Sequence, residues 1–151
     1  FSVGGAFNPH VRHLKAAVKR MERKIDAGAE YFLTQPIYDI KLIEEVYEAT
    51  KHLEQPIFIG IMPLVSKRNA DFLHFEVPGI TLPEEIRERM DGHETKEAAI
   101  EEGIRISQEL VDAAMKYFNG IYLITPFLKY EITEHLVKYV REKQEVKEGI
   151  N

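Results

Sequence analysis

The sequence predicts an α/β fold of the (β/α)8-barrel type that contains four strand–helix units, which is half of a barrel. Short apolar runs alternate with amphipathic helical segments along the chain. Each run ends in or next to a loop that contains proline, and this repeated order is typical of parallel strands joined by helices. The chain has 151 residues, whereas a complete (β/α)8 barrel needs roughly 250.

Four runs are predicted as strands because they are short, apolar and bounded by turn residues. They cover residues 1–7, 31–34, 57–61 and 121–125. The carboxyl ends of parallel strands meet at one edge of the sheet, and barrel proteins place their ligand-binding side chains there. We therefore expect functional residues in the loops after these strands.

Helices are predicted where apolar residues recur with the helical period. They cover residues 11–27, 39–52, 66–75, 83–90, 96–117 and 130–141. Asp39 and Thr95 suit the N-cap position, and Gly28 suits the position that ends a helix. Residues 142–151 are charged and contain glycine, so we expect a frayed tail. No linker divides the chain, and residues 1–151 are treated as one structural unit.

The composition argues against several classes of protein. The chain has 20 Lys and Arg against 25 Asp and Glu, a formal charge of −5, whereas a nucleic-acid-binding surface is basic. Without cysteine there is no disulfide, no cysteine-based metal site and no thiol nucleophile. No apolar run approaches the ~20 residues of a membrane span, and no signal-peptide pattern opens the sequence. We expect a cytoplasmic protein with neither nucleic acid nor membrane as a partner.

Four short motifs resemble the methylenetetrahydrofolate reductase family in their order and spacing. They are GGAFNPH at residues 4–10, RKIDAGA at 23–29, TQPIYD at 34–39 and GIMPL at 60–64. The sequence is most similar to the reductase part of bacterial proteins that fuse a homocysteine S-methyltransferase to a methylenetetrahydrofolate reductase.

The resemblance implies a barrel that carries FAD and passes hydride from NAD(P)H through the flavin to 5,10-methylenetetrahydrofolate, which gives 5-methyltetrahydrofolate. The four strands would be the fifth to eighth of that barrel. The family's catalytic Glu and its Asp near the flavin would precede residue 1, so we assign no catalytic residue. Because Phe1 already lies in a strand-like run, we expect a part of a longer enzyme, inactive without the N-terminal half of the barrel.

The resemblance assigns three residues to the folate substrate, namely Gln35, Asn69 and Lys129. Gln35 follows the second strand, and its amide offers the donor and acceptor that the edge of a pterin requires. Asn69 stands where some members have a folate-contacting Gln, and Lys129 stands near an Arg thought to meet the glutamate tail. The aromatic residue that stacks on the pterin in some members corresponds to Leu73, with Phe72 beside it, so the stacking residue stays open.

Four residues are assigned to the flavin on the same resemblance, namely Phe7, His10, Arg23 and Lys24. Phe7 ends the first strand, where the family usually has an aromatic residue, and a core position is equally consistent. His10 aligns with a family His and would bond either a ligand phosphate or the loop backbone. Arg23 and Lys24 match basic positions near the nucleotide end of the flavin. Arg20 is assigned to the solvated face of the helix.

No metal is expected, because the histidines lack consistent ligand spacing. Two other functions stay open. A half-barrel with two open edges and an apolar inner face would bind a partner or self-associate without catalysis. Alternatively, another barrel enzyme would bind a phosphate ester near residues 126–129.

Overall fold

Four parallel strands form the centre of the computed structural model, which describes residues 1–149. Strands β1 (Gly4–Phe7), β2 (Tyr31–Pro36), β3 (Ile57–Ile61) and β4 (Gly120–Leu123) lie in the order β1-β2-β3-β4. Every neighbouring pair is parallel, so each connection returns across the sheet through at least one helix. The predicted α/β class with four strand–helix units is confirmed.

Six helices lie in the described part of the chain. They are α1 (Leu14–Asp26), α2 (Ile40–Thr50), α3 (Lys67–Phe75), α4 (Glu84–Arg89), α5 (Lys96–Tyr117) and α6 (Tyr130–Glu148). The connection from β3 to β4 contains three of them, α3, α4 and α5, and α6 follows β4. Among residues 1–149, no helix combines the length and the apolar character needed to cross a bilayer.

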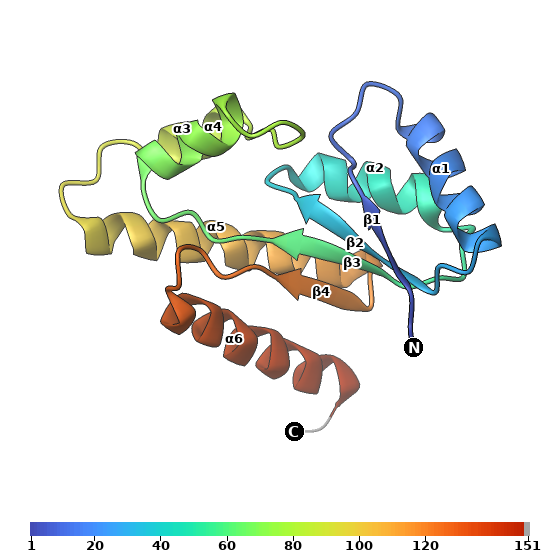
Figure 1. The fold of residues 1–151 in the computed structure, drawn as a ribbon. Coiled ribbons are helices and arrows are strands. Elements are labelled where there is room, and N and C mark those ends of the chain that lie inside the picture. The colour runs from blue at the N-terminus through green and yellow to red at the C-terminus, as the bar shows by residue number, and fades with distance from the viewer. Residues whose placement is uncertain (150–151) are drawn as a thin grey trace.

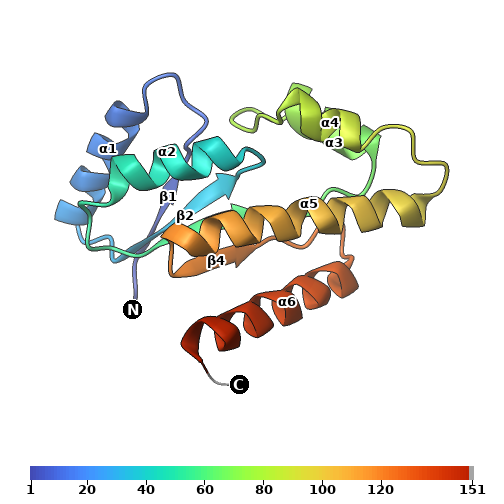
Figure 2. The same ribbon diagram turned by 180° about the vertical axis from the view of Figure 1, so that it is seen from behind.

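The helices cover one face of the sheet and leave the other open. α2 and α5 lie behind the sheet in Figure 1 and in front of it in Figure 2, with α1 beside β1 and α6 beside β4. α3 and α4 lie beyond the carboxyl ends of the strands (Figure 1). We call the uncovered side the open face, which in a closed barrel is the interior.

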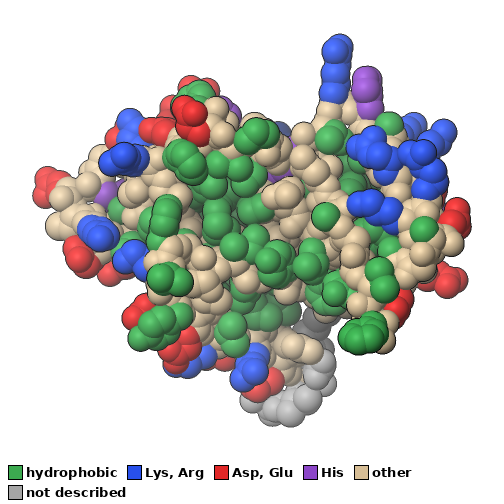
Figure 3. Space-filling model, viewed as in Figure 1, with side chains coloured by type: hydrophobic (Ala, Val, Ile, Leu, Met, Phe, Trp, Pro, Cys, Tyr) green, Lys and Arg blue, Asp and Glu red, His purple; other side chains and the backbone are tan. Residues whose placement is uncertain are grey.

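Successive side chains of a strand point to opposite faces of the sheet, and this alternation decides which of them reach the open face. Phe32 and Ile59 are fully buried against the helices, so Tyr31, Leu33 and Phe58 point the other way. The rings of Tyr31 and Phe58 meet edge to face, with their centroids 6.0 Å apart. Figure 3 views this side of the molecule and shows hydrophobic side chains gathered across its centre. The open face is therefore apolar.

The core lies between the sheet and its covering helices, and close approach of α5 requires a glycine there. Ile43 and Val46 of α2 and Val111 of α5 are fully buried. At Gly103, a Cβ atom would collide with the backbone carbonyl of Leu64. Glycine costs about 1 kcal/mol in a helix, but here it allows α5 to pack against the chain that leaves β3.

The predicted helix ends are confirmed where the side-chain chemistry is specific. The Asp39 carboxylate accepts a hydrogen bond from Lys41 N at 2.9 Å, and the Thr95 hydroxyl accepts one from Ala98 N at 3.2 Å. Each bond satisfies a backbone donor that the first turn of a helix leaves unpaired. Gly28, which follows α1, has φ of +103°, a conformation that L side chains rarely adopt.

The C-terminal segment differs from the expected frayed tail over residues 142–151, because α6 continues to Glu148. Lys143 explains part of the difference, since its ammonium lies 3.2 Å from a carboxylate oxygen of Asp112 on α5. Charged residues with high helix propensity fill this stretch, and Gly149 ends the helix with φ of +70°. The last two residues of the predicted tail lie outside the described part of the chain.

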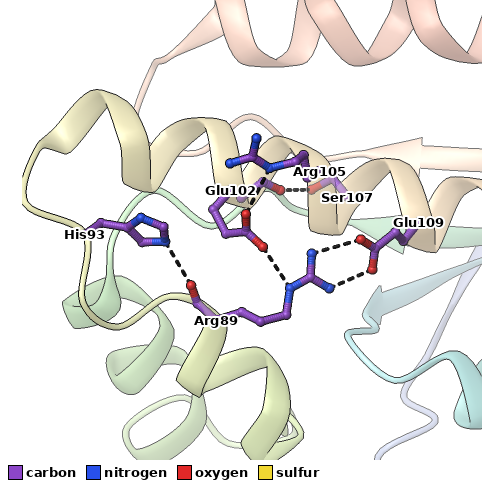
Figure 4. Close-up of polar contacts among 7 residues, drawn as sticks. Arg89, His93, Glu102, Arg105, Ser107 and Glu109 are labelled. Carbon is purple, nitrogen blue, oxygen red and sulfur yellow. Dashed lines mark hydrogen bonds and ion pairs between the residues drawn. The ribbon is translucent and has the colours of Figure 1, made fainter.

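An ion-pair network joins α4 to α5 (Figure 4). The Arg89 guanidinium donates to both carboxylate oxygens of Glu109, at 2.7 and 2.8 Å, and its Nε donates to Glu102 at 2.8 Å. Arg105 Nε donates to the other Glu102 oxygen at 2.9 Å. Burial alone would raise the pKa of Glu102, but the two arginines outweigh it and hold this pKa below its ordinary value. The network fixes the short helix α4 against α5.

We expect Arg89→Met to lower the free energy of unfolding by about 2 kcal/mol, because it leaves the half-buried Glu102 with one partner fewer. Urea denaturation at neutral pH measures this loss. Arg105→Met is the matched control, since its exposed side chain is a weaker contributor. Equal stability of Arg89→Met and the wild-type chain would contradict the role of the network.

The same network predicts an acid-dependent loss of stability. Because the pKa of Glu102 is lowered in the folded chain, its contribution is fully present above the ordinary Glu value of 4.5. It is lost as the pH falls through the lowered value. Glu102→Gln should therefore lose less stability than the wild-type chain when thermal denaturation is compared at neutral pH and at a pH below 4.

Candidate functional site

The carboxyl edge of the sheet brings together the loops that follow the four strands. Because the strands are parallel, residues after Phe7, Pro36, Ile61 and Leu123 all lie at this edge. Helices α3 and α4 belong to the connection after β3 and border the same edge (Figure 1). Gln35, His10, Asn69 and Lys129 are thereby carried on separate elements that border one side of the molecule.

A cavity of about 230 Å³ lies at the carboxyl end of β1, between this strand and α1. It is lined by Ala6, Phe7, Asn8, Ala17, Arg20, Met21, Lys24 and Gln35. The cavity brings Gln35, predicted to contact folate, together with Lys24, predicted to contact the flavin. It combines an exposed amide with two cations, and we call it the β1 cavity.

The cations of the β1 cavity are held by α1. Lys24 Nζ donates a hydrogen bond of 2.6 Å to the backbone carbonyl of Ala6, which keeps the ammonium beside the end of β1. Arg20 lies one helical turn earlier, so both side chains border one space. Figure 3 shows basic side chains gathered over this part of the molecule. In a chain with a net charge of −5, this local positive charge suits an anionic ligand.

Sequence reasoning did not assign Arg20 and Asn8 to the site, although both line the β1 cavity. Arg20 was expected on the solvated face, and its spacing of four residues from Lys24 was the available signal. The Asn8 side chain accepts a hydrogen bond of 2.9 Å from His10 N. Asn followed by Pro directly after a strand is a typical loop-forming pair, and here it shapes the wall of the cavity.

Phe7 and Arg23, both assigned to the flavin, lie in contrasting environments. Phe7 lines the β1 cavity but is only 3 % exposed, and it belongs to the hydrophobic core. This burial favours the core position that the sequence left open. Arg23 is exposed on α1 and is not among the residues that line the cavity. The flavin contact of both residues stays a prediction.

His10 borders a second cavity of about 240 Å³ together with Asp39, Leu42, Glu45, Thr81 and Pro83. Its Nε2 lies 2.7 Å from the carbonyl oxygen of Pro36. A carbonyl can only accept, so Nε2 carries the proton and Nδ1 has the free lone pair. Burial lowers the pKa of His10, against the opposing effects of the Pro36 carbonyl and Asp39. At neutral pH the imidazole is therefore uncharged and bonded to the loop backbone.

On α3, Asn69 and Leu73, both considered for folate contact, make contacts within the protein. Asn69 is 7 % exposed, and its side-chain oxygen accepts a hydrogen bond of 3.3 Å from Val65 N. Leu73 is 5 % exposed and packs in the core, whereas the ring of Phe72 is 52 % exposed. Of the two candidates for stacking, Phe72 has the accessible ring.

Lys129 lies in the loop between β4 and α6, which has an unusual backbone. Phe127 and Leu128 have φ of 48° and 63°, left-handed values that are uncommon for residues other than glycine. Both side chains are largely exposed, and Lys129 N donates to the Pro126 carbonyl at 2.9 Å. Since β3 lies between β2 and β4, Gln35 on β2 and Lys129 in the loop after β4 lie at the same edge but are separated by a strand.

No group of three or more metal-ligating side chains occurs within residues 1–149. The described edge carries amides, cations, exposed aromatic rings and the His10 imidazole beside Asp39. Such groups bind and orient a ligand.

Four parallel strand–helix units with polar side chains at the carboxyl edge define a half of a (β/α)8 barrel. The family model described as methylenetetrahydrofolate reductase matches residues 5–144. The chain belongs to the methylenetetrahydrofolate reductase family.

A solved structure supports the fold. It is described as an uncharacterized protein from Clostridium thermocellum that binds two copies of 5-methyl-5,6,7,8-tetrahydrofolic acid. It matches with a TM-score of 0.68 at 19 % identity, over 97 % of this chain and 54 % of that one. The chain thus spans about half the length of this structure, and at this identity the likeness concerns the fold alone. A search of curated proteins found no match.

We expect the His10 imidazole to titrate below its ordinary value of 6.5, because burial disfavours the charged ring. Because the pKa of His10 is lower in the folded chain, the free energy of unfolding should decrease as the pH falls from 6.5 toward this lowered pKa. NMR titration of the ring protons measures the midpoint. In Asp39→Asn, which keeps the helix cap, loss of the carboxylate should lower this midpoint further. A midpoint at or above 6.5 would contradict the buried geometry.

Proposed function

We propose that the chain is the folate-facing half of a flavin-dependent methylenetetrahydrofolate reductase. The parent enzyme would use NAD(P)H to reduce 5,10-methylenetetrahydrofolate to 5-methyltetrahydrofolate. The observation that carries the proposal is the exposed amide of Gln35 at the carboxyl edge of β2, in a chain whose family match spans residues 5–144. The described strands would be the fifth to eighth of the barrel.

Gln35 suits the recognition of a pterin ring. The pterin edge alternates hydrogen-bond donors and acceptors, and a primary amide offers both in one plane. The side chain is exposed, while the strand that carries it is held between β1 and β3. A rigid support of this kind limits the entropy that is lost when a ligand binds.

The β1 cavity suits the phosphates of the flavin. Lys24 and Arg20 supply two positive charges on one side of the cavity, and charge-assisted hydrogen bonds to phosphate are strong. FAD, when bound, would supply the hydride transfer. The residues of this chain would hold the nucleotide end of FAD and orient the folate toward the flavin. Arg23 would serve as an outer cation, and Phe7 would form a wall of the cavity.

Other residues of the carboxyl edge would complete the folate site. Lys129 offers a cation for the glutamate carboxylates of the substrate. Asn69 would position the loop at Val65, to which it is bonded, and Phe72 offers an exposed ring for stacking. His10, bonded to the Pro36 carbonyl, would support the peptide next to Gln35.

The partners follow from the same proposal. The N-terminal half of the barrel would cover the open face and supply the catalytic residues, so we expect no turnover by this chain alone. In the parent, a homocysteine S-methyltransferase would be fused to the reductase, which fits methionine biosynthesis in the cytoplasm.

Gln35→Ala should weaken binding of 5-methyltetrahydrofolate by about tenfold, because it removes hydrogen bonds to the pterin. Isothermal titration calorimetry with the 151-residue chain measures the affinity. Gln55→Ala is the matched control, since Gln55 precedes β3 at the opposite edge of the sheet. Equal affinity of Gln35→Ala and the wild-type chain would overturn the folate role of Gln35.

A second candidate function is self-association without catalysis, and the exposed sheet favours it. β1 and β4 are both edge strands, and the open face carries aromatic residues such as Tyr122, which is 40 % exposed. Unpaired strand edges and apolar faces favour a partner. Two copies would supply the eight strands of a closed barrel.

Light scattering should then give twice the 17.5 kDa mass of one chain. Tyr122→Lys should shift this mass toward one chain, because it places a charge in the apolar face. Tyr130→Lys is the control, since this exposed tyrosine belongs to α6 and not to the sheet. A stable monomer at all concentrations would exclude this candidate.

A further inference from the structure

An interruption in the pairing of β2 with β3 sets the backbone at Gln35. Leu33 lies opposite Phe58, and Pro36 lies opposite Gly60. Three residue steps on β2 therefore match two steps on β3, which defines a β-bulge with one extra residue. Bulges are rare between parallel strands, and they are over-represented next to functional sites because they redirect a side chain.

The cause of the bulge is the missing donor of Pro36. Phe32 N donates to the carbonyl of Pro56 at 2.9 Å. Four residues further along both strands, a regular parallel ladder would join the N–H of residue 36 to the carbonyl of Gly60. Proline has no N–H, and Ile37 N donates to the Gly60 carbonyl instead, at 3.0 Å. The extra residue enters β2 because the ladder resumes one position later.

The Thr34 hydroxyl bonds to the backbone of both strands at the bulge. Gly60 N donates to Thr34 Oγ1 at 2.8 Å, and the same hydroxyl donates to the carbonyl of Gln35 at 2.8 Å. Thr34 is 4 % exposed and Gly60 is buried as well, so loss of this hydroxyl would remove a buried hydrogen bond from the Gly60 N–H. One buried side chain thus fixes both sides of the Gln35 peptide.

Gly60 permits the close approach that this arrangement needs. A Cβ at position 60 would lie 2.7 Å from the Thr34 carbonyl oxygen and 3.1 Å from that of Gln35. Any larger residue would push β3 away from the bulge. Thr34, Gly60 and Pro36 therefore act as one unit around Gln35, and we call it the Thr34 bulge.

We propose that Thr34 is a positioning residue, which directs the Gln35 amide toward the ligand by closing the bulge through its hydroxyl. This role of Thr34 rests on the proposed function in one respect, namely that Gln35 contacts folate. Thr34 itself touches no ligand, since its side chain is buried on the helix-covered side of the sheet.

The test compares Thr34→Val, which has the same shape without the hydroxyl, with Thr34→Ser, which keeps it. In Thr34→Val, NMR should show faster hydrogen exchange of the Gly60 amide and averaged χ1 couplings of Gln35. Affinity for 5-methyltetrahydrofolate, measured by calorimetry, should fall about tenfold, as in Gln35→Ala. Thr34→Ser should resemble the wild-type chain in all three measurements.

Two results would overturn the positioning role. One is a Gln35 side chain with unchanged χ1 couplings in Thr34→Val. The other is unchanged affinity of Thr34→Val when Gln35→Ala has lost affinity, in which case the proposed function stands and the role of Thr34 does not. If the wild-type chain and Gln35→Ala bind equally, the folate role of Gln35 fails, and the χ1 couplings alone decide whether Thr34 directs the amide.

A second variant tests the role of the bulge if Thr34→Val does not fold. Pro36→Ala restores the missing N–H without removing a partner of Gly60, so the ladder can continue without the extra residue. We expect exchange protection to appear at residue 36 and the χ1 couplings of Gln35 to change. Retention of the wild-type couplings together with a protected N–H at residue 36 would show that the bulge does not direct Gln35.

Discussion

Parallel pairing of the four strands is the constraint on which the rest of this structure depends. A parallel ladder forces each strand to be reached through a crossover, and the crossovers here place α1, α2 and α5 on one side. It also forces all four carboxyl ends to one edge. The amide of Gln35, the cations of α1 and the loop before α6 meet at that edge because of the pairing, although up to about 100 residues separate them in sequence.

Small departures from regular pairing give this edge its specific shape. Pro36 lacks a backbone N–H donor, and the hydrogen bond from Gly60 N to the Thr34 hydroxyl stabilises the bulge that results. In the loop after β4, Phe127 and Leu128 adopt left-handed backbone. Strained or irregular backbone persists only where the surroundings fix it, and it concentrates at ligand-binding sites. Both departures lie at the carboxyl edge, whereas the covering helices are regular.

Charge is distributed unevenly over an acidic chain. Lys24 and Arg20 border the β1 cavity, while Arg89 is neutralised by Glu102 and Glu109. The first pair remains available to an anion, and the second network serves stability by holding α4 against α5 (Figure 4). Residue type alone does not distinguish these two uses of arginine, because the partners lie 13 and 20 residues away in sequence.

The sequence by itself determined the number, order and type of the elements. Apolar periodicity marked all four strands and all six helices, and Asp39 and Thr95 marked two helix starts, because these signals are local. It also placed Gln35 at the carboxyl end of a strand, and the family resemblance assigned Lys24 to the flavin. Tertiary structure alone decided that both line one cavity with Arg20, that Phe7 is buried, and that α6 extends to Glu148. Those outcomes depend on contacts between distant segments, and no local pattern encodes them.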